Sequence, residues 1–148
     1  MKLKRLLTTS LALVLLSACS TSAPFKSLTA GACSSEQKQL VDDHISSQIS
    51  AISKEDWPLA YSFAAKSFQD SIDITSFEVI IADSYSYLID NKGITFGGCE
   101  IKDGKIFQEV TVISNEDKSE LSYRLSVVDQ KLGVEAANLV EQSESLKT

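Results

Sequence analysis

Three cysteines, Cys19, Cys33 and Cys99, are the side chains with the most distinctive chemistry in this sequence. A cysteine thiol can be acylated, oxidised to a disulfide or used as a metal ligand. The spacing of these cysteines matches no metal motif, and His44, the only histidine, cannot complete one. The sequence therefore predicts acylation and disulfide formation, with no metal or other cofactor.

The segment before Cys19 has the layout of an export signal. Residues 1–5 form a basic head, and residues 6–16 form an apolar run that is too short to span a bilayer. The junction Leu16-Ser17-Ala18-Cys19 resembles the lipobox of bacterial lipoproteins. This resemblance implies that the signal, residues 1–18, is removed and that a diacylglyceryl group is attached to Cys19. We expect an exported protein, anchored by lipid at the extracytoplasmic face of a bacterial membrane. The alternatives are a plain signal peptide and a cytosolic protein with an apolar N-terminus.

Cys33 and Cys99 remain as an even pair in an oxidising compartment if Cys19 is acylated. We expect them to form a disulfide, which would close a long loop and stabilise the fold by roughly 4 kcal/mol on the loop-entropy model. The sequence alone does not bring their Cβ atoms together, so two buried free thiols are the alternative.

The charge of the mature chain limits its partners. Removal of the signal takes away three positive charges and changes the formal net charge from −6 to −9. An acidic domain repels phosphate backbones, so we expect no nucleic-acid partner. Membrane attachment must come from the acyl chains, because no basic cluster is left to attract lipid headgroups.

Tyrosines and carboxylates are the residues that could carry out catalysis. In a steroid-isomerase-like pocket, Tyr61 or Tyr85 could stabilise an oxyanion while Asp83 or Glu109 moves a proton. Nothing in their spacing makes these side chains converge. No nucleophile elbow, phosphate-binding glycine loop or HExxH motif occurs either, so we expect no catalytic residue.

His44 is expected to be a partly buried structural residue. It follows Asp43 in the sequence, but adjacent helical positions lie about 100° apart around the axis and do not face each other. The two residues therefore do not form a catalytic dyad.

The first half of the chain has helical periodicity. Ser34 and Gln37 have capping-box spacing, and a helix to about residue 53 follows, with an apolar face that includes Gln48. A second helix is predicted over residues 57–68, with Asp56 as N-cap. A third is predicted over residues 76–82, extending towards 88. Its expected start is a capping box at Thr75 and Glu78, with a hydrophobic staple between Ile74 and Val79.

The second half alternates with a period of two. Strands are predicted at 94–102, 105–114, 121–127 and 132–140, with a hairpin turn at Asp103-Gly104 and a bulge at Gly97-Gly98. The sequence therefore predicts an α+β domain over residues 34–141, in which three N-terminal helices pack on a curved four-stranded antiparallel sheet. A flexible tether is expected at 19–33 and a polar tail at 142–148.

One part of the sequence resembles a known family. The residues that carry the likeness are Gln48-Ile49-Ser50-Ala51, Asp56-Trp57-Pro58-Leu59-Ala60-Tyr61-Ser62-Phe63-Ala64, Phe68 and Phe77. They are similar to the bacterial family called domain of unknown function 4864. Members of that family look like cone-shaped domains of the nuclear-transport-factor-2-like superfamily. The resemblance implies a fold but no catalytic residue, because the superfamily includes enzymes, ligand binders and interaction modules.

We expect a non-catalytic domain that binds either a small apolar ligand or a protein partner. A ligand binder would have a concave pocket with a few polar groups, and the residues expected to line it are Tyr61, Tyr85, Phe96, Phe107 and Tyr123. An interaction module would fill this pocket and expose an apolar patch, or form a homodimer through the sheet. An isomerase- or dehydratase-like enzyme is the alternative, and it would hold a carboxylate of raised pKa beside a tyrosine hydroxyl.

Overall fold

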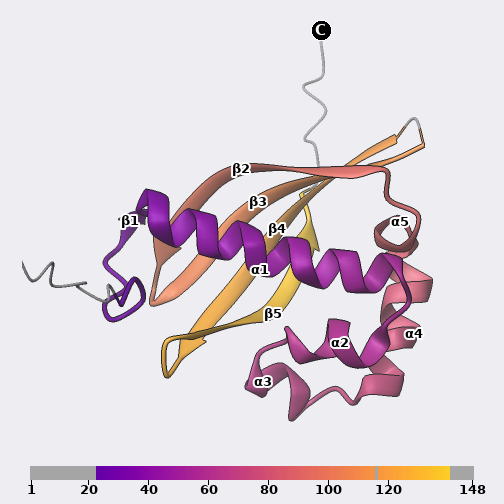
Figure 1. The fold of residues 1–148 in the computed structure, drawn as a ribbon, viewed down its shortest axis with the longest axis horizontal. Coiled ribbons are helices and arrows are strands. Elements are labelled where there is room, and N and C mark those ends of the chain that lie inside the picture. The colour runs from indigo at the N-terminus through magenta and orange to yellow at the C-terminus, as the bar shows by residue number, and fades with distance from the viewer. Residues whose placement is uncertain (1–22, 116, 141–148) are drawn as a thin grey trace, which may run out of the picture.

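The computed structural model describes residues 23–115 and 117–140. The expected export signal, Cys19 and the expected tail at 142–148 lie outside these residues. In the described part, the chain forms five helices and one five-stranded antiparallel sheet (Figure 1). The α+β class is confirmed. The expected three helices on four strands are wrong, because two of the expected helices are interrupted and an additional strand precedes the first helix.

The elements follow one another as helices and then as a meander, apart from the short first strand. The helices are α1 (Ser35–Ser53), α2 (Trp57–Ser62), α3 (Lys66–Gln69), α4 (Ile74–Ser84) and α5 (Ser86–Ile89). The strands are β1 (Gly31–Ala32), β2 (Gly93–Lys102), β3 (Lys105–Ser114), β4 (Asp117–Val128) and β5 (Lys131–Leu139). Each strand pairs with the next, in the order β1-β2-β3-β4-β5.

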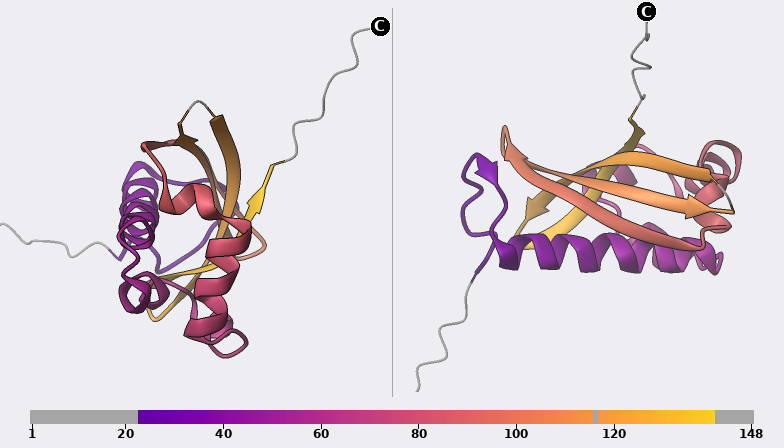
Figure 2. Two further views of the ribbon diagram at one scale, coloured as in Figure 1. Left: turned by 90° about the vertical axis from the view of Figure 1, so that its right-hand side faces the viewer. Right: turned by 90° about the horizontal axis from the view of Figure 1, so that it is seen from above.

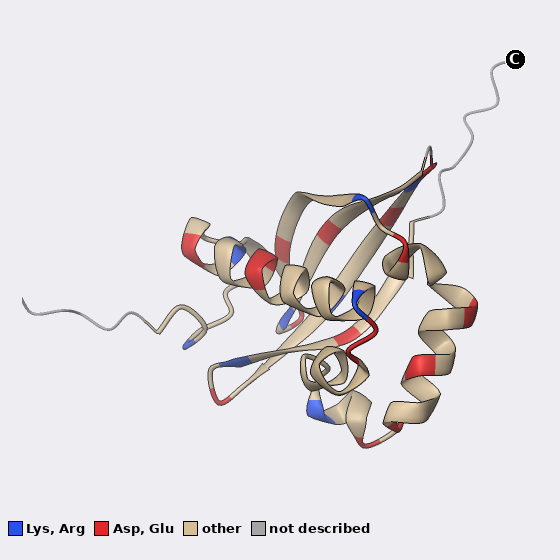
Figure 3. Cartoon of the chain, turned by 45° about the vertical axis from the view of Figure 1, so that its right-hand side comes forward, with Lys and Arg blue, Asp and Glu red and all other residues tan. Residues whose placement is uncertain are grey.

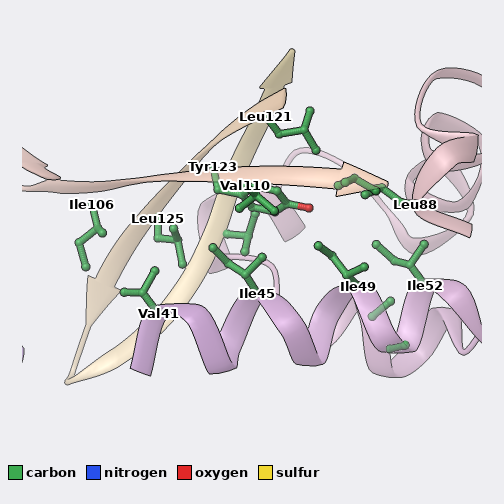
Figure 4. Close-up of a cluster of buried hydrophobic side chains, with 14 of the residues drawn as sticks. Val41, Ile45, Ile49, Ile52, Leu88, Ile106, Val110, Leu121, Tyr123 and Leu125 are labelled. Carbon is green, nitrogen blue, oxygen red and sulfur yellow. The ribbon is translucent and has the colours of Figure 1, made fainter. Parts of the chain in front are cut away.

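Helix α1 begins at the expected capping box. The backbone N–H of Gln37 donates to Ser34 Oγ (3.2 Å), and the backbone N–H of Ser34 donates to Gln37 Oε1 (2.9 Å). The helix then runs along one face of the sheet (Figure 2). Its buried apolar side chains point towards those of the strands in Figure 4. The main residues of this core are Val41, Ile45, Ile49, Ile52, Ile106, Val110, Leu121, Tyr123 and Leu125.

The expected second helix is interrupted between α2 and α3, because residues 63–65 pair with strand β5. The N–H of Ala65 donates to Val134 O (2.8 Å), and the N–H of Val134 donates to Phe63 O (3.0 Å). Gly133 makes this approach feasible, since a Cβ at that position would lie 2.5 Å from Ala65 Cα. A tertiary contact thus replaces helical hydrogen bonds that periodicity alone would predict.

The start and end of the expected third helix also differ. Asp73, rather than Thr75, is the N-cap, and its carboxylate accepts from the backbone N–H of Ser76 (2.7 Å). The expected staple is wrong, because Ile74 and Val79 are both exposed on α4. Helix α4 ends at Ser84, and α5 is a separate short helix after Tyr85.

The sheet confirms the predicted hairpin and bulge. Strands β2 and β3 meet at Asp103-Gly104, where both residues have positive φ angles. The register shifts by one residue between Phe96 and Cys99. The carboxylate of Glu109 occupies the space beside this bulge and accepts from the N–H of Gly98 (2.9 Å).

Residues 23–33, expected to be the end of a flexible tether, are packed against the domain instead. Strand β1 pairs with β2, and Phe25 is buried in the core cluster. Cys33 and Cys99 form the expected disulfide, with Cα atoms 5.4 Å apart. The side chain of Gln37 also donates to Pro24 O (2.7 Å), so α1 holds this segment from a second point. None of the helices in the described residues is long and apolar enough to cross a membrane.

Candidate ligand pocket

A pocket opens between the outer strand β5 and the helices at the C-terminal end of α1. Its volume is about 200 Å³. The helices contribute Ile52, Phe68, Phe77, Ile80 and Ile81, and the sheet contributes Tyr123 and residues 134–138. The lining is therefore mostly apolar, with few polar groups among the described residues.

A cluster of aromatic rings fixes the helical wall. Phe77 of α4 is buried at its centre, and the ring centroids of Trp57, Tyr61 and Phe68 lie 6.4, 5.7 and 6.0 Å from its own. The Trp57 and Phe68 contacts are edge-to-face, a favourable geometry for aromatic pairs. Helices α2, α3 and α4 are thereby held as one wall.

Tyr123 contributes the most deeply buried polar group of the pocket. It points to the same face of β4 as Leu121 and Leu125, and only 1% of its surface is exposed. Its hydroxyl makes no hydrogen bond to any described residue. Burial raises the pKa of this hydroxyl well above its ordinary value, and the neighbouring Tyr87 and Tyr85 add to the effect. The group is therefore neutral at physiological pH and has a proton to donate.

Tyr85 lies beside the pocket and is already engaged. Its hydroxyl donates to Ala137 O on β5 (2.8 Å), and its ring centroid lies 6.0 Å from that of Tyr87. The Tyr87 hydroxyl is buried without a partner in the described structure. Burial, followed by the neighbouring Tyr85, raises the pKa of Tyr87 to about 12. Three tyrosines therefore gather near the pocket, and only Tyr85 has its hydroxyl paired.

Gln48 is the second buried polar residue in the lining. It belongs to α1 and is 3% exposed, and its amide nitrogen donates to Ala60 O (3.3 Å). A carbonyl oxygen can only accept a hydrogen bond, so the atom of Gln48 that faces Ala60 O is the amide nitrogen. The other terminal atom of the side chain is therefore the amide oxygen. That oxygen has no hydrogen bond to the described residues.

Glu135 is the only acidic residue among the described residues of this lining, and its carboxylate lies on the other side of the sheet. It pairs with Lys105 Nζ (2.5 Å) and Arg124 Nε (3.1 Å), whose positions alternate with the buried Ile106 and Leu125. Burial alone would raise the pKa of Glu135. Hydrogen bonds from Lys105 and Ser126, with the charges of Lys105 and Arg124, outweigh burial and lower the pKa. The pocket therefore contains no carboxylate of raised pKa.

The structure brings together two of the five residues expected in a pocket, Tyr85 and Tyr123. Tyr61 stands behind the wall and donates its hydroxyl to Gln69 O (3.2 Å) and Ile72 O (2.6 Å). The Phe96 ring lies under the ammonium group of Lys38, 5.5 Å from its centroid. Phe107 lines a shallow depression on the opposite face of the sheet.

Sequence reasoning missed the helical wall and Gln48. Phe68 and Phe77 were recognisable as core aromatics, but their place beside β5 depends on the interruption between α2 and α3. Gln48 offered a signal, because it is a polar residue on an otherwise apolar helix face. The polar side chain of such a residue forms a hydrogen bond within the core, lines a cavity, or does both. Gln48 does both, because it donates to Ala60 O and lines the pocket.

The side chains expected in the enzyme alternative do not converge. Asp83 is exposed on α4, and Glu109 faces the bulge on the outer side of the sheet. No group of three or more potential metal ligands occurs in the described residues. The described residues thus do not form the acid–base pair of the enzyme alternative.

His44 lies outside this pocket and has the expected structural role. Its Nε2 donates to Phe63 O (3.0 Å), and its ring packs edge-on against Phe63, with the ring centroids 5.1 Å apart. Burial lowers the pKa of His44, and the hydrogen bond to Phe63 opposes this only in part. The neutral imidazole therefore helps to hold the residues that follow α2.

Comparison with known proteins gives one match. A family model described as "Domain of unknown function (DUF4864)" matches residues 34–145, a range that includes every residue of the pocket. No curated protein and no solved structure shows significant similarity to this chain.

Proposed function

Because this chain belongs to the family described as Domain of unknown function (DUF4864), whose description carries no activity, we propose a function from its pocket. The domain binds a small, mostly apolar molecule and does not change it chemically. The observation that carries this proposal is Tyr123, a residue that is buried in the lining of an open apolar pocket and whose hydroxyl makes no hydrogen bond to the described residues.

The energetics of the pocket support a ligand. The Tyr123 hydroxyl makes no hydrogen bond to the described residues, so a bound molecule can provide its partner. The volume of about 200 Å³ exceeds the ~150 Å³ of an engineered apolar cavity that binds benzene. A molecule with one ring or a short apolar chain would fit.

The enzyme alternative has less support. It needs a carboxylate of raised pKa beside a tyrosine hydroxyl, whereas Glu135 is ion-paired on the other face and its pKa is lowered.

An interaction module has one observation in its favour. Three apolar side chains of α4 are exposed, namely Ile74, Val79 and Ile80. Only Ile80 also lines the pocket, so the two functions can be separated by mutation.

A plug at the rim tests the binding function. Ile80→Trp would fill the pocket mouth, while Val79→Trp would enlarge an exposed neighbour that does not line the pocket. Toluene, indole and phenol would be titrated into each protein and followed by backbone amide chemical shifts. We expect shifts around the pocket in the wild type and V79W, and none in I80W. Absence of binding by all three probes in the wild type, or equal binding by I80W, would refute the proposal.

The location remains a proposal as well. We infer that the chain is a bacterial lipoprotein whose Cys19 carries the lipid anchor, on the resemblance of residues 16–19 to a lipobox. The Cys33–Cys99 disulfide supports export, because disulfides persist in oxidising compartments. A place in the nuclear-transport-factor-2-like superfamily is supported by helices that cover one face of the sheet beside an open pocket.

Cell fractionation tests the anchor. Cys19→Ser removes the only thiol that could be acylated at this junction, so the protein should move from the membrane fraction to the soluble extracytoplasmic fraction. Ser20→Ala is the matched control, because it changes the neighbouring residue but leaves the thiol of Cys19, and it should leave the protein on the membrane. Membrane retention of C19S would count against lipidation.

A further inference from the structure

We propose that the ligand of this pocket is an uncharged molecule with a single ring and a hydroxyl group, and that this hydroxyl pairs with Tyr123. The inference rests on the proposed binding function and specifies its ligand. It follows from three properties of the pocket: its charge, its shape and its unpaired polar atoms.

The ligand should be neutral, because no charged group of the described lining faces the pocket. The described residues of the pocket lining include no Lys, Arg or His, so an anionic ligand would be buried among them without a counter-charge. A cationic ligand finds no carboxylate either, because that of Glu135 is held on the opposite face by Lys105 and Arg124. Both signs of charge would be desolvated without compensation.

The aromatic wall selects a ring of modest size. Phe68 and Phe77 meet edge-to-face, with ring centroids 6.0 Å apart, and both line the pocket together with Tyr85. A ligand ring can add to this arrangement by the same edge-to-face contacts. The volume of about 200 Å³ has room for one ring and few further atoms.

The unpaired polar atoms select a hydroxyl. Tyr123 keeps a phenolic proton to donate, because its pKa is raised, and Gln48 presents an amide oxygen that can only accept. A ligand hydroxyl accepts the proton of Tyr123 and still has its own proton for an acceptor such as Gln48. A hydrocarbon would leave both groups unpaired, and an ether or ketone could not donate to Gln48.

Three probes of similar size separate these properties: phenol, toluene and benzoate. They would be titrated into the full chain carrying Cys19→Ser, and dissociation constants obtained from backbone amide shifts. We expect phenol to bind about tenfold more tightly than toluene, the factor that corresponds to one net hydrogen bond of about 1.4 kcal/mol. Benzoate should not bind at pH 7, where it is ionised.

Tyr123→Phe tests the assignment of the hydrogen bond. It removes only the hydroxyl, so the preference for phenol over toluene should fall to about onefold while toluene still binds. Tyr61→Phe is the matched control, because that hydroxyl donates to Gln69 and Ile72 outside the pocket, and the preference should persist.

The outcomes distinguish this inference from the proposed function. Equal binding of phenol and toluene by the wild type, a retained preference in Y123F, or binding of benzoate would overturn the ligand class but leave a functional pocket. If none of the three probes binds, the binding function itself fails. A thermal unfolding curve of Y123F identifies a folding defect, and Ile80→Trp then replaces it as the variant that must abolish phenol binding.

Discussion

At the scale of single residues, the tyrosines differ in what their hydroxyls do. Tyr61 and Tyr85 donate to backbone carbonyls, whereas Tyr123 and Tyr87 have no partner among the described residues. A paired hydroxyl stabilises the fold, and an unpaired buried hydroxyl costs free energy. The first two hydroxyls therefore stabilise the structure, and of the other two only that of Tyr123 belongs to a residue that lines the pocket and is available to the proposed ligand.

This difference predicts opposite effects of the same substitution on stability. Tyr61→Phe removes hydrogen bonds to Gln69 and Ile72 and should lower the free energy of unfolding by about 1–2 kcal/mol. Tyr123→Phe should leave that free energy unchanged or slightly raised. Urea unfolding of both variants without ligand measures the effect. A loss in Y123F as large as that in Y61F would show that the Tyr123 hydroxyl is paired after all.

His44 should make stability depend on pH in a narrow range. Burial lowers its pKa in the folded state, so the unfolded chain binds the proton more readily, and stability rises with pH. The stabilisation by the neutral ring is complete above the ordinary value of 6.5 and is lost as the pH falls below it. One proton limits the slope to about 1.4 kcal/mol per pH unit.

His44→Gln is the variant that tests this dependence. The glutamine amide can donate to Phe63 O but does not titrate. Between pH 6.5 and about 5, the free energy of unfolding should fall in the wild type and stay level in H44Q, as measured by urea unfolding at each pH. Parallel curves would assign the dependence to other groups.

At the scale of elements, the contact between residues 63–65 and β5 determines the shape of the pocket. It ends α2, turns the chain into α3 and places Phe68 opposite the outer strand. It also covers part of the β5 edge, which would otherwise present unpaired backbone groups. One short bridge therefore both protects an edge strand and positions the helical wall.

Gly133→Ala should break this bridge. An added Cβ would lie 2.5 Å from Ala65 Cα, a backbone atom that cannot move without disturbing α3, so we expect a loss of about 1–3 kcal/mol in unfolding free energy. Gly93→Ala is the matched control, because nothing lies within 4 Å of a Cβ there. Thermal or urea unfolding of the two variants checks the prediction, and similar stabilities would contradict it.

The disulfide joins the start of α1 to β2. Cys33 precedes the N-cap Ser34, and Cys99 follows the bulge, at a sequence separation of 66. Replacing both by serine should lower the free energy of unfolding by about 4 kcal/mol on the loop-entropy model. Urea unfolding of the wild type with and without reductant provides the comparison. No difference between the oxidised and reduced proteins would contradict the prediction.

The sequence predicted those elements whose signals are local. The capping box at Ser34, the turn at Asp103-Gly104 and the bulge at Gly97-Gly98 depend on neighbouring residues alone. The interruption at residues 63–65 and the pairing of β1 depend on strands far away in the chain, and no local pattern encodes them. The pocket was predictable only at Tyr85 and Tyr123, because its helical wall follows from that interruption.

At the scale of the whole molecule, the charged residues lie on the surface and the apolar residues form the core and the pocket. Figure 3 shows acidic residues on the helices and the sheet, with basic residues scattered between them. The described surface therefore does not favour a polyanion, in agreement with the net charge of −6 for the whole chain. The apolar pocket is a local exception to this polar exterior.

The position of β1 determines where the proposed lipid anchor would be connected to the domain. Strand β1 and the disulfide lie at the first turn of α1, and the pocket lies beside Gln48 and Ile52, about 20 to 26 Å further along the helix. With the proposed anchor at Cys19, the stem to the buried Phe25 can reach at most roughly 20 Å. The attachment point and the pocket mouth are then at opposite poles. A guest molecule would enter at the end of α1 that is farther from the proposed anchor.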